Sequence, residues 1–355
     1  MSLQEKFTSK QLTIIIIAIC AVFIFLGIFT MVIGNEAESS SEKYVTVDSS
    51  DDSGSDVSGR KYKFSDREDR SEGGAQEDSM TVNKPMEGDP YQELDELIGL
   101  ESVKEEVRSL ANFVKVQKMR EEKGLKSPKL SYHLVFTGSP GTGKTTVARI
   151  VARIYKDLGI LKKGHLVETD RSGLIGKYVG QTAPRVNAAC DSALNGVLFI
   201  DEAYALTQSE SSQDYGAEAV ATLLKRMEDD RDKLVVIVAG YTNEMKKFID
   251  TNPGLESRFN RYIHFPDYTA EELYKIFRMY LKKNQYTITK EAASFVQEHL
   301  ENKVATKDRN FGNARYVRNL FEKTIQAQAN RIAKSGKVSE EELVEITLSD
   351  IKRAI

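Results

Sequence analysis

Glycines, hydroxyl groups and a lysine are combined in one short segment, residues 138–145, which reads Gly-Ser-Pro-Gly-Thr-Gly-Lys-Thr. An apolar run precedes this segment at 134–137, and a run with one apolar face follows it at 146–154. Glycines let backbone N–H groups curl around a polyphosphate because no Cβ stands in the way, and the N-terminus of a following helix adds partial positive charge. A strand, a Gly-rich turn and a helix in this order predict a nucleotide-binding loop.

Within this loop, Lys144 is expected to neutralise the β- and γ-phosphates of ATP, and the Thr145 hydroxyl is expected to ligate Mg²⁺. The alternative is a chance turn before a core helix, which the complete motif in its required context disfavours. The other expected nucleotide contacts are Ser139, Pro140, Gly141, Thr142, Gly143 and Thr146.

Two adjacent acids end an apolar strand predicted over 196–200. Asp201 is expected to hold Mg²⁺, largely through water, and Glu202 is expected to orient and polarise the attacking water. A core strand that happens to end in surface carboxylates is the alternative. A module that only binds nucleotide needs the metal-binding acid but not the second one, so Glu202 indicates hydrolysis.

The apolar run that begins at Leu234 is the next buried strand, and it ends in polar residues up to Asn243. The carboxyl ends of strands in a doubly wound sheet face the ligand crevice. We therefore expect Asn243 or Thr242 to contact the γ-phosphate or its water. The start of a simple loop is an equal alternative for either residue.

The composition excludes some classes of partner and site. The 355 residues carry a net charge of −3, with no strong basic footprint, so nucleic acid is not expected as a specific partner. The two cysteines imply no disulfide framework, and the four histidines lack the spacing of zinc ligands.

Residues 12–33 are 22 positions without a charge, and a helix of about 33 Å would cross a bilayer core of roughly 30 Å. A cleaved signal peptide would have a shorter apolar region, of about 7–15 residues, and a buried helix would need a core that nothing near 1–11 supplies. We expect a single-pass membrane anchor. Lys6 and Lys10 precede the span, so the positive-inside rule by itself would place the catalytic domain outside the cytoplasm. Because an ATPase needs ATP, we instead expect the catalytic domain in the cytoplasm.

The rest of the chain is predicted to have three parts. Residues 34–90 hold 15 Asp or Glu against seven Lys or Arg and few apolar residues, which predicts a disordered linker. Over 91–266, apolar strands alternate with amphipathic helices, so we expect an α/β domain with a parallel sheet and helices on both faces. A capping box at 269–272 and further helical runs predict a small all-α domain over 267–355, with helices at 291–301, 313–333 and 349–355.

The order of these parts resembles the AAA+ ATPases, a class of P-loop NTPases, and specifically the CbxX/CfxQ family, over roughly 94–355. That family includes the stage V sporulation protein K group, red-type Rubisco activators and ATPases associated with type VII secretion. The wider AAA+ pattern ends its fourth strand in Ala-Thr-Asn, whereas 239–243 reads Ala-Gly-Tyr-Thr-Asn, so the sensor-1 position stays open by one or two residues. The motifs that carry the resemblance are Leu-Ile-Gly-Leu at 97–100, Tyr-Val-Gly-Gln-Thr-Ala-Pro at 178–184, Phe-Ile-Asp-Glu-Ala-Tyr at 199–204, Asp-Tyr-Gly at 214–216 and Gly-Asn-Ala-Arg at 312–315.

The resemblance implies roles for residues outside the loop. Ile98 and Gly99 would pack on adenine, and Arg315 would reach from the helical lid to the nucleotide of its own subunit. Arg258, supported by Arg261, would reach the γ-phosphate of a neighbouring subunit and stabilise transition-state charge. Ordinary exposed arginines, in surface ion pairs for Arg258 and Arg261, are the alternative.

Tyr178, flanked by Lys177, Val179 and Gly180, matches the pore loop with which such a ring grips a threaded polypeptide. A packing aromatic is the alternative, but the neighbouring glycines suit a mobile loop better than a core.

Together these features predict a membrane-anchored AAA+ ATPase that forms a homo-oligomeric ring, expected to be a hexamer, and remodels or threads a protein substrate. A nucleotide-gated scaffold that organises a membrane-associated assembly of the sporulation or secretion type, without threading, is the competing function. A Rubisco activator is disfavoured, because the expected anchor and acidic linker do not fit a soluble protein.

Overall fold

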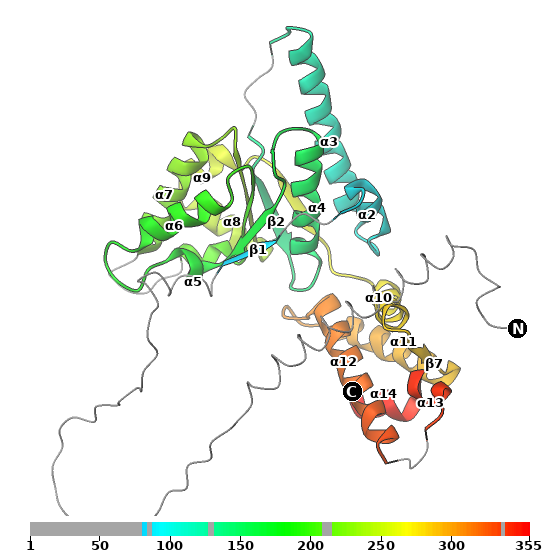
Figure 1. The fold of residues 1–355 in the computed structure, drawn as a ribbon. Coiled ribbons are helices and arrows are strands. Elements are labelled where there is room, and N and C mark those ends of the chain that lie inside the picture. Colours follow the sequence, from blue (N-terminus) through cyan, green and yellow to red (C-terminus); the bar gives the residue numbers. More distant parts are fainter. Residues whose placement is uncertain (1–79, 84–86, 127–130, 208–214, 335–337) are drawn as a thin grey trace, which may run out of the picture. The chain divides into compact units, whose positions relative to one another are not determined.

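The computed structural model describes residues 80–83, 87–126, 131–207, 215–334 and 338–355 (Figure 1). Its main sheet has six strands in the order β1-β3-β4-β5-β2-β6. All neighbouring strands run parallel except β1, which pairs antiparallel with β3, so that Met80 lies opposite Thr169. The strands are β1 (Met80–Asn83), β2 (Leu134–Gly138), β3 (Leu166–Thr169), β4 (Gly196–Ile200), β5 (Leu234–Gly240) and β6 (Tyr262–Phe265).

Strand β1 corrects two predictions, because it lies in the interval expected to be a disordered linker and makes the sheet mixed rather than parallel. An edge strand needs little apolar surface of its own: Val82 is 57% exposed, and the pairing rests on the β3 backbone and a hydrogen bond of 3.3 Å from Asn83 to Glu168. A periodicity argument misses so short a strand. The remainder of 34–90 before residue 80 lies outside the described residues.

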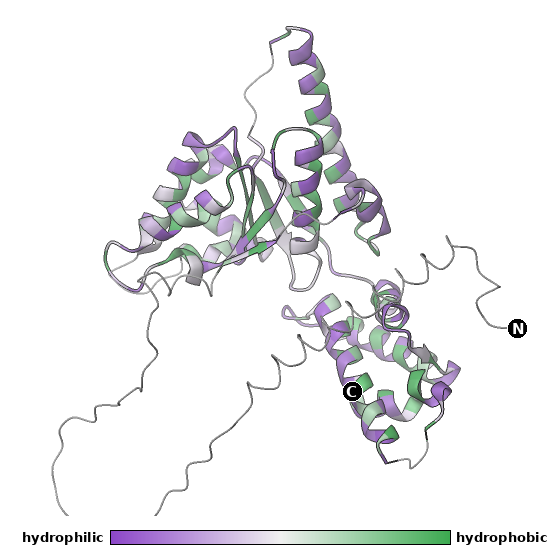
Figure 2. Cartoon of the chain, in the orientation of Figure 1, coloured by the Kyte–Doolittle hydropathy of each residue, from purple (hydrophilic) through white to green (hydrophobic). Residues whose placement is uncertain are grey.

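Helices cover both faces of the sheet, as predicted, because the central strands are apolar on both sides. Alternate residues of a strand point to opposite faces. Phe136 of β2 accordingly packs in one apolar cluster with helices α3 and α4, whereas its neighbour Val135 packs in a second cluster with α6, α7 and α8 (Figures 1 and 2). The helices of this part are α2 (Pro90–Glu96), α3 (Glu101–Glu122), α4 (Lys144–Asp157), α5 (Arg171–Leu174), α6 (Thr182–Ser192), α7 (Tyr215–Asp229), α8 (Thr242–Asp250) and α9 (Pro253–Arg258), with a short 3₁₀ helix, η2, at Ala203–Thr207.

The C-terminal part is helical, as expected, apart from one pair of two-residue strands, β7 (Thr287–Ile288) and β8 (Glu345–Ile346). The predicted capping box is present: the Glu272 carboxylate accepts from the Thr269 backbone N–H at 2.8 Å, and the Thr269 hydroxyl accepts from the Glu272 N–H at 3.2 Å. The helices are α10 (Ala270–Lys283), α11 (Lys290–Ala305), α12 (Asn313–Ile332), α13 (Glu340–Val344) and α14 (Leu348–Ala354).

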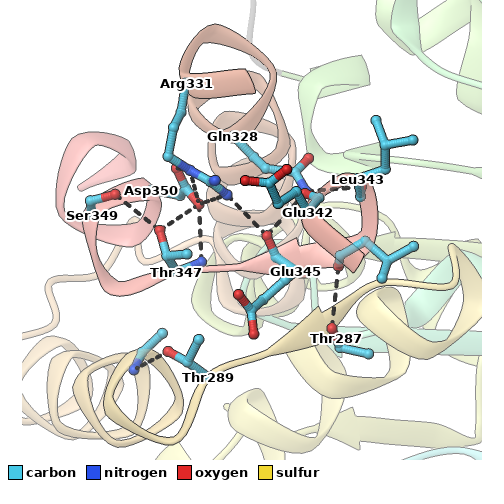
Figure 3. Close-up of polar contacts among 12 residues, drawn as sticks. Thr287, Thr289, Gln328, Arg331, Glu342, Leu343, Glu345, Thr347, Ser349 and Asp350 are labelled. Atoms are coloured by element: carbon cyan, nitrogen blue, oxygen red, sulfur yellow. Dashed lines mark hydrogen bonds and ion pairs between the residues drawn. The ribbon is translucent and has the colours of Figure 1, made fainter. Parts of the chain in front are cut away.

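A polar network fixes the last helices of this part (Figure 3). The buried Asp350 carboxylate accepts two hydrogen bonds of 2.9 Å from Arg331 and caps α14 by accepting from the Thr347 N–H at 3.0 Å. Burial opposes ionisation of Asp350, but these partners outweigh it and hold its pKa below the ordinary value of 3.8. Gln328 donates to the carbonyls of Leu343 and Glu345, so α12 holds the chain that returns to β8.

The predicted membrane localisation is corrected. Within the described ranges, no helix combines the length and the apolar character needed to cross a bilayer. The longest of the described helices, α3, has 22 residues, but many of its exposed positions carry charged side chains, such as Glu105, Glu106 and Arg108. The predicted span, residues 12–33, lies outside the described residues.

Candidate functional site

A cavity of ≈ 580 Å³ lies where three strands of the main sheet end. Gly138 at the end of β2, Asp201 directly after β4 and Gly240 at the end of β5 all line it. In parallel α/β sheets this edge is where ligands bind. The volume falls in the range of small-molecule sites, which is about 300–1,000 Å³.

The phosphate loop, residues 138–145, has a backbone that only glycine accommodates without strain at three positions. Gly138, Gly141 and Gly143 have φ of +148°, +70° and +94°. A Cβ on Gly141 would lie 2.1 Å from the backbone oxygen of Gly312. The Thr142 hydroxyl closes the loop by donating to the Ser139 carbonyl at 2.8 Å. The glycine pattern is therefore a conformational requirement, and it suits the close approach of a phosphate group.

Lys144 begins helix α4, and its ammonium group donates to the carbonyls of Gly138 at 2.9 Å and Ser139 at 2.8 Å. Burial lowers its pKa, and Arg315 acts in the same direction, whereas Asp201 and Glu202 oppose the shift. Among the described residues, the hydrogen-bond partners of this ammonium are backbone carbonyls, and its place beside a helix N-terminus favours an anionic ligand.

Asp201 and Glu202 both line the cavity. The Asp201 backbone N–H donates to the Thr169 carbonyl of β3 at 2.9 Å, and its carboxylate accepts from the Glu202 N–H at 3.1 Å. Burial raises the pKa of Asp201, and the charge of Lys144 opposes this. Lys144 and Asp201 are therefore complementary charges across the cavity. Thr145, the other predicted metal ligand, lines the same cavity, so the residues present fit a Mg²⁺–nucleotide pair.

Part of the cavity lining is apolar and suits the flat face of a base. Ile98, predicted to pack on adenine, lines it together with Leu97, Leu100, Ile276 and Met279. Gly99 does not line it. Instead, Gly99 has φ +63°, and a Cβ there would lie 2.2 Å from the Glu272 carboxylate. Its role in the fold is to let residues 97–100 approach the start of α10.

Helix α12 contributes two arginines to the cavity: Arg315, a predicted site residue, and Arg318, which was not predicted from the sequence. The start of this helix is bonded to the phosphate loop, because the Ala314 N–H donates to the Gly141 carbonyl at 3.1 Å. Helical spacing is the signal that could have found Arg318, since residues three apart share a helix face.

Two further residues of this region were not predicted as site residues from the sequence. Tyr268 lines the cavity, and Asn313 lies beside it. The Tyr268 hydroxyl donates to the Thr142 carbonyl at 3.5 Å, and burial raises its pKa to about 12. Asn313 is fully buried and bonds to the loop residue Pro140 at 3.3 Å. Asn313 is part of the Gly-Asn-Ala-Arg motif, so its presence was noted but not its contacts.

The two residues predicted as the sensor, Thr242 and Asn243, follow the end of β5. Gly240 and Tyr241 line the main cavity, whereas Thr242 and Asn243 line a second cavity of ≈ 320 Å³. Helix α8 begins at Thr242, so Thr242 and Asn243 belong to the first turn of a helix rather than to the end of the strand. The second cavity shares Gly138 with the first, so Asn243 remains near the loop.

Arg258 and Arg261 do not line the cavity of their own chain. Arg258 donates to Glu228 and to the Gly254 carbonyl, both at 3.3 Å. The Arg261 guanidinium lies over the ring of Phe113, 4.6 Å from its centroid. Each side chain therefore has a partner within the chain, and neither reaches the phosphate loop.

The predicted pore-loop residues 177–180 lie in the turn between α5 and α6. Tyr178 is 69% exposed and Val179 is 79% exposed, so neither packs in an apolar core. The ends of the turn are held by hydrogen bonds of 3.3 Å between the Tyr178 N–H and the Gln181 side chain and 3.1 Å between the Gly176 N–H and Thr182. The turn thus presents an aromatic and a branched apolar side chain to solvent from a braced base.

Two sequence families match this chain in adjacent stretches. Residues 134–267 match the ATPase family associated with various cellular activities (AAA), and residues 269–355 match the AAA lid domain. Their junction falls at residue 268, one position from the predicted start of the lid.

Proteins of known sequence match most of the chain. It is 45% identical over 261 residues to the chloroplastic ribulose bisphosphate carboxylase/oxygenase activase of Cyanidioschyzon merolae, covering 73% of this chain and 88% of that protein. It is 45% identical over 258 residues to the CfxQ homologue of Cyanidium caldarium, covering 72% of this chain and 90% of the relative. The ESX-3 secretion system protein EccA3 of Mycobacterium tuberculosis is 44% identical over 280 residues, which are 74% of this chain but 44% of the relative.

Solved structures share the fold. The AAA domain of FIGL-1 superposes with a TM-score of 0.53 at 20% identity, covering 78% of this chain and 85% of that domain. The same domain in complex with ADP gives a TM-score of 0.52.

Proposed function

This chain belongs to the CbxX/CfxQ family of AAA+ ATPases, and from that premise we propose that it works as a homo-oligomeric ring that hydrolyses ATP to remodel or thread a protein. The observation that carries the proposal is that one cavity holds a phosphate loop, two acids and Arg315, while Arg258 lies outside it. A site completed by a neighbouring subunit explains why Arg258 is absent from the cavity of its own chain.

The lining of the cavity supports the following roles for its residues. Lys144 and the loop N–H groups would hold the β- and γ-phosphates, and the apolar wall at Ile98 would hold the base. Bound Mg²⁺, held by Thr145 and through water by Asp201, would neutralise charge on the transferred phosphate. Glu202 would hold the attacking water in line and accept its proton.

Completion of the site requires a second subunit. An arginine that stabilises transition-state charge raises the rate of phosphoryl transfer by about 10³–10⁵. Arg258 sits on α9 at a position where its guanidinium is held by Glu228 and by the Gly254 carbonyl. In a ring, which we propose to be a hexamer, this guanidinium would face the γ-phosphate bound by the adjacent chain.

The mechanical output would pass through Tyr178. Its exposed ring, on a short turn braced at both ends, suits transient apolar contact with an extended polypeptide. Lys177 beside it would favour acidic or polar stretches of that chain. Two relatives carry names that involve a protein target or a protein assembly, an activase and a secretion system protein, and this accords with a protein substrate. The expected membrane anchor was one reason to disfavour an activase-type role. Because the membrane localisation is corrected, that reason no longer applies.

The experiment compares protein capture by three variants, Tyr178→Ala, Tyr178→Phe and Met119→Ala, each of which also carries Glu202→Gln so that ATP stays bound. Tyr178→Ala should lose the captured proteins, whereas Tyr178→Phe should retain them. Met119→Ala is the control and should also retain them, because Met119 is exposed but lies on α3. In the wild-type background, Tyr178→Ala should keep basal ATP hydrolysis. Mass spectrometry of the captured proteins and phosphate release are the measurements.

A scaffold that threads nothing is the competing function. It predicts equal capture by the Tyr178→Ala and Tyr178→Phe chains, and that result would remove the threading part of the proposal while leaving the ATPase assignment intact.

A further inference from the structure

Asn313, the first residue of α12, is buried with no exposed surface and has a left-handed backbone, φ +44°. Asparagine tolerates this conformation better than most residues. Its side-chain amide is fully bonded: the nitrogen lies 3.0 Å from Asp267, 3.2 Å from the Phe311 carbonyl and 3.3 Å from the Pro140 carbonyl, and the oxygen accepts from the Tyr268 N–H at 3.0 Å.

These partners belong to three different parts of the molecule. Pro140 is in the phosphate loop, Asp267 and Tyr268 are in the segment that joins the main sheet to the lid, and Asn313 itself begins the helix that carries Arg315. The buried amide is therefore a single junction of loop, connector and lid. A buried side chain with all its polar atoms bonded is rigid, because any shift leaves a donor or acceptor unpaired.

The same junction is reinforced by close backbone contact. The Ala314 N–H donates to the Gly141 carbonyl at 3.1 Å, and Gly141 has no room for a Cβ against Gly312. The Asp267 carboxylate also accepts from Lys307 at 2.6 Å and from the Ser139 side chain. The segment that joins the main sheet to the lid is thus bonded both to the lid, through Lys307, and to the phosphate loop, through Ser139.

We propose that Asn313 is a positioning residue that couples the lid to the phosphate loop, so that the contribution of Arg315 to nucleotide binding depends on the Asn313 amide. The reason is geometric, since Arg315 lies two residues further along the same helix and its direction is set by where that helix begins. This inference rests on the proposed role of Arg315 as a nucleotide contact.

The test is a double-mutant cycle on the full chain, with ADP and Mg²⁺ as the probe and the dissociation constant from calorimetry as the readout. Asn313→Gly removes the amide but keeps the left-handed backbone, and it should weaken ADP binding about tenfold. Arg315→Ala should weaken binding by a similar factor. The double variant should bind no more weakly than Arg315→Ala alone, because the two residues act as one unit.

The matched control is Thr324→Val on the same helix. Thr324 is equally buried, but its hydroxyl donates only to the Leu320 carbonyl, at 2.7 Å. This change should lower the melting temperature without altering ADP affinity. If Asn313→Gly does not fold, Asn313→Asp keeps the acceptor for Tyr268 and loses the donors to Pro140 and Asp267, and the same relation to Arg315→Ala is expected.

The outcomes separate the inference from the proposed function. If Arg315→Ala leaves ADP affinity unchanged, the assignment of Arg315 as a nucleotide contact fails, and the coupling fails with it. If Arg315→Ala weakens binding, but the Asn313 variants bind ADP normally or their effect simply adds to it, the coupling is wrong and the role of Arg315 stands.

Discussion

At the scale of single residues, the backbone of Glu202 is the most telling feature of the cavity. Glu202 has φ +48°, a conformation that a non-glycine residue adopts at a cost and that is common where a side chain must be aimed. The turn directly follows β4, so Asp201 and Glu202 both reach the cavity although they are adjacent in the chain. Two adjacent residues of a continuing strand would point to opposite faces.

Glu202→Gln should therefore retain nucleotide binding and lower the rate of ATP hydrolysis by about 10²–10⁴, the usual contribution of a general base. Phosphate release and nucleotide affinity are the two measurements. Glu298→Gln, the same chemical change on the exposed side of α11, is the control and should leave both unchanged. Hydrolysis at the normal rate by Glu202→Gln would reject Glu202 as the base.

At the scale of elements, a buried histidine links the central strands β2 and β5 in addition to the backbone hydrogen bonds between them. His133 precedes β2, and its ring nitrogen accepts from the Val236 N–H of β5 at 2.9 Å. Burial, followed by the charge of Arg258, lowers its pKa from 6.5 to about 4, although a hydrogen bond with the Met227 backbone opposes the shift. The histidine is therefore neutral in the folded protein at pH 7.

The depressed pKa predicts that stability falls on acidification. The stabilising effect is complete above pH 6.5, where the unfolded chain is also neutral, and is lost as the pH falls toward about 4, because the unfolded chain gains the proton first. The loss amounts to about 3 kcal/mol. Urea unfolding at pH 7.5, 5.5 and 4.5 measures it.

His133→Gln is the comparison chain for this prediction, because glutamine keeps an acceptor for the Val236 N–H but does not titrate. Its stability should change less between pH 7.5 and 4.5 than that of the wild type. Identical pH profiles for the two chains would contradict the assignment. Asp350 contributes acid lability to both chains equally, since its lowered pKa also removes stability as the pH falls.

At the scale of the whole molecule, the decisive fact is that Arg258 does not reach the cavity of its own chain. We expect Arg258→Ala to bind nucleotide normally and to lose hydrolysis by about 10³-fold or more. Arg231→Ala is the matched control, because Arg231 also pairs with Glu228 but is not proposed to face a nucleotide.

Mixing two inactive chains tests whether the arginine acts between subunits. Lys144→Ala chains lack the loop lysine but supply Arg258, and Arg258→Ala chains have an intact loop. Mixed rings should recover part of the ATPase activity that neither chain shows alone. Co-assembly without any recovery would exclude action in trans.

The sequence by itself determined the nucleotide loop, the acids after β4 and the helical lid, because each depends on residues close together in the chain. Backbone conformation at glycines, strand periodicity and helix capping are short-range effects, and they carry over directly into the structure. The same reasoning failed for β1, whose pairing with β3 spans more than eighty residues, as the contact between Asn83 and Glu168 shows.

Only the tertiary structure decided which side chains share the cavity. Asn313 and Pro140 are 173 positions apart, and their hydrogen bond exists because the lid helix packs on the loop. Asn243 lines the neighbouring cavity rather than the main one, and Arg258 of α9 pairs with Glu228. Local sequence specifies what chemistry a segment can perform, whereas the packing of distant segments determines which of those groups meet.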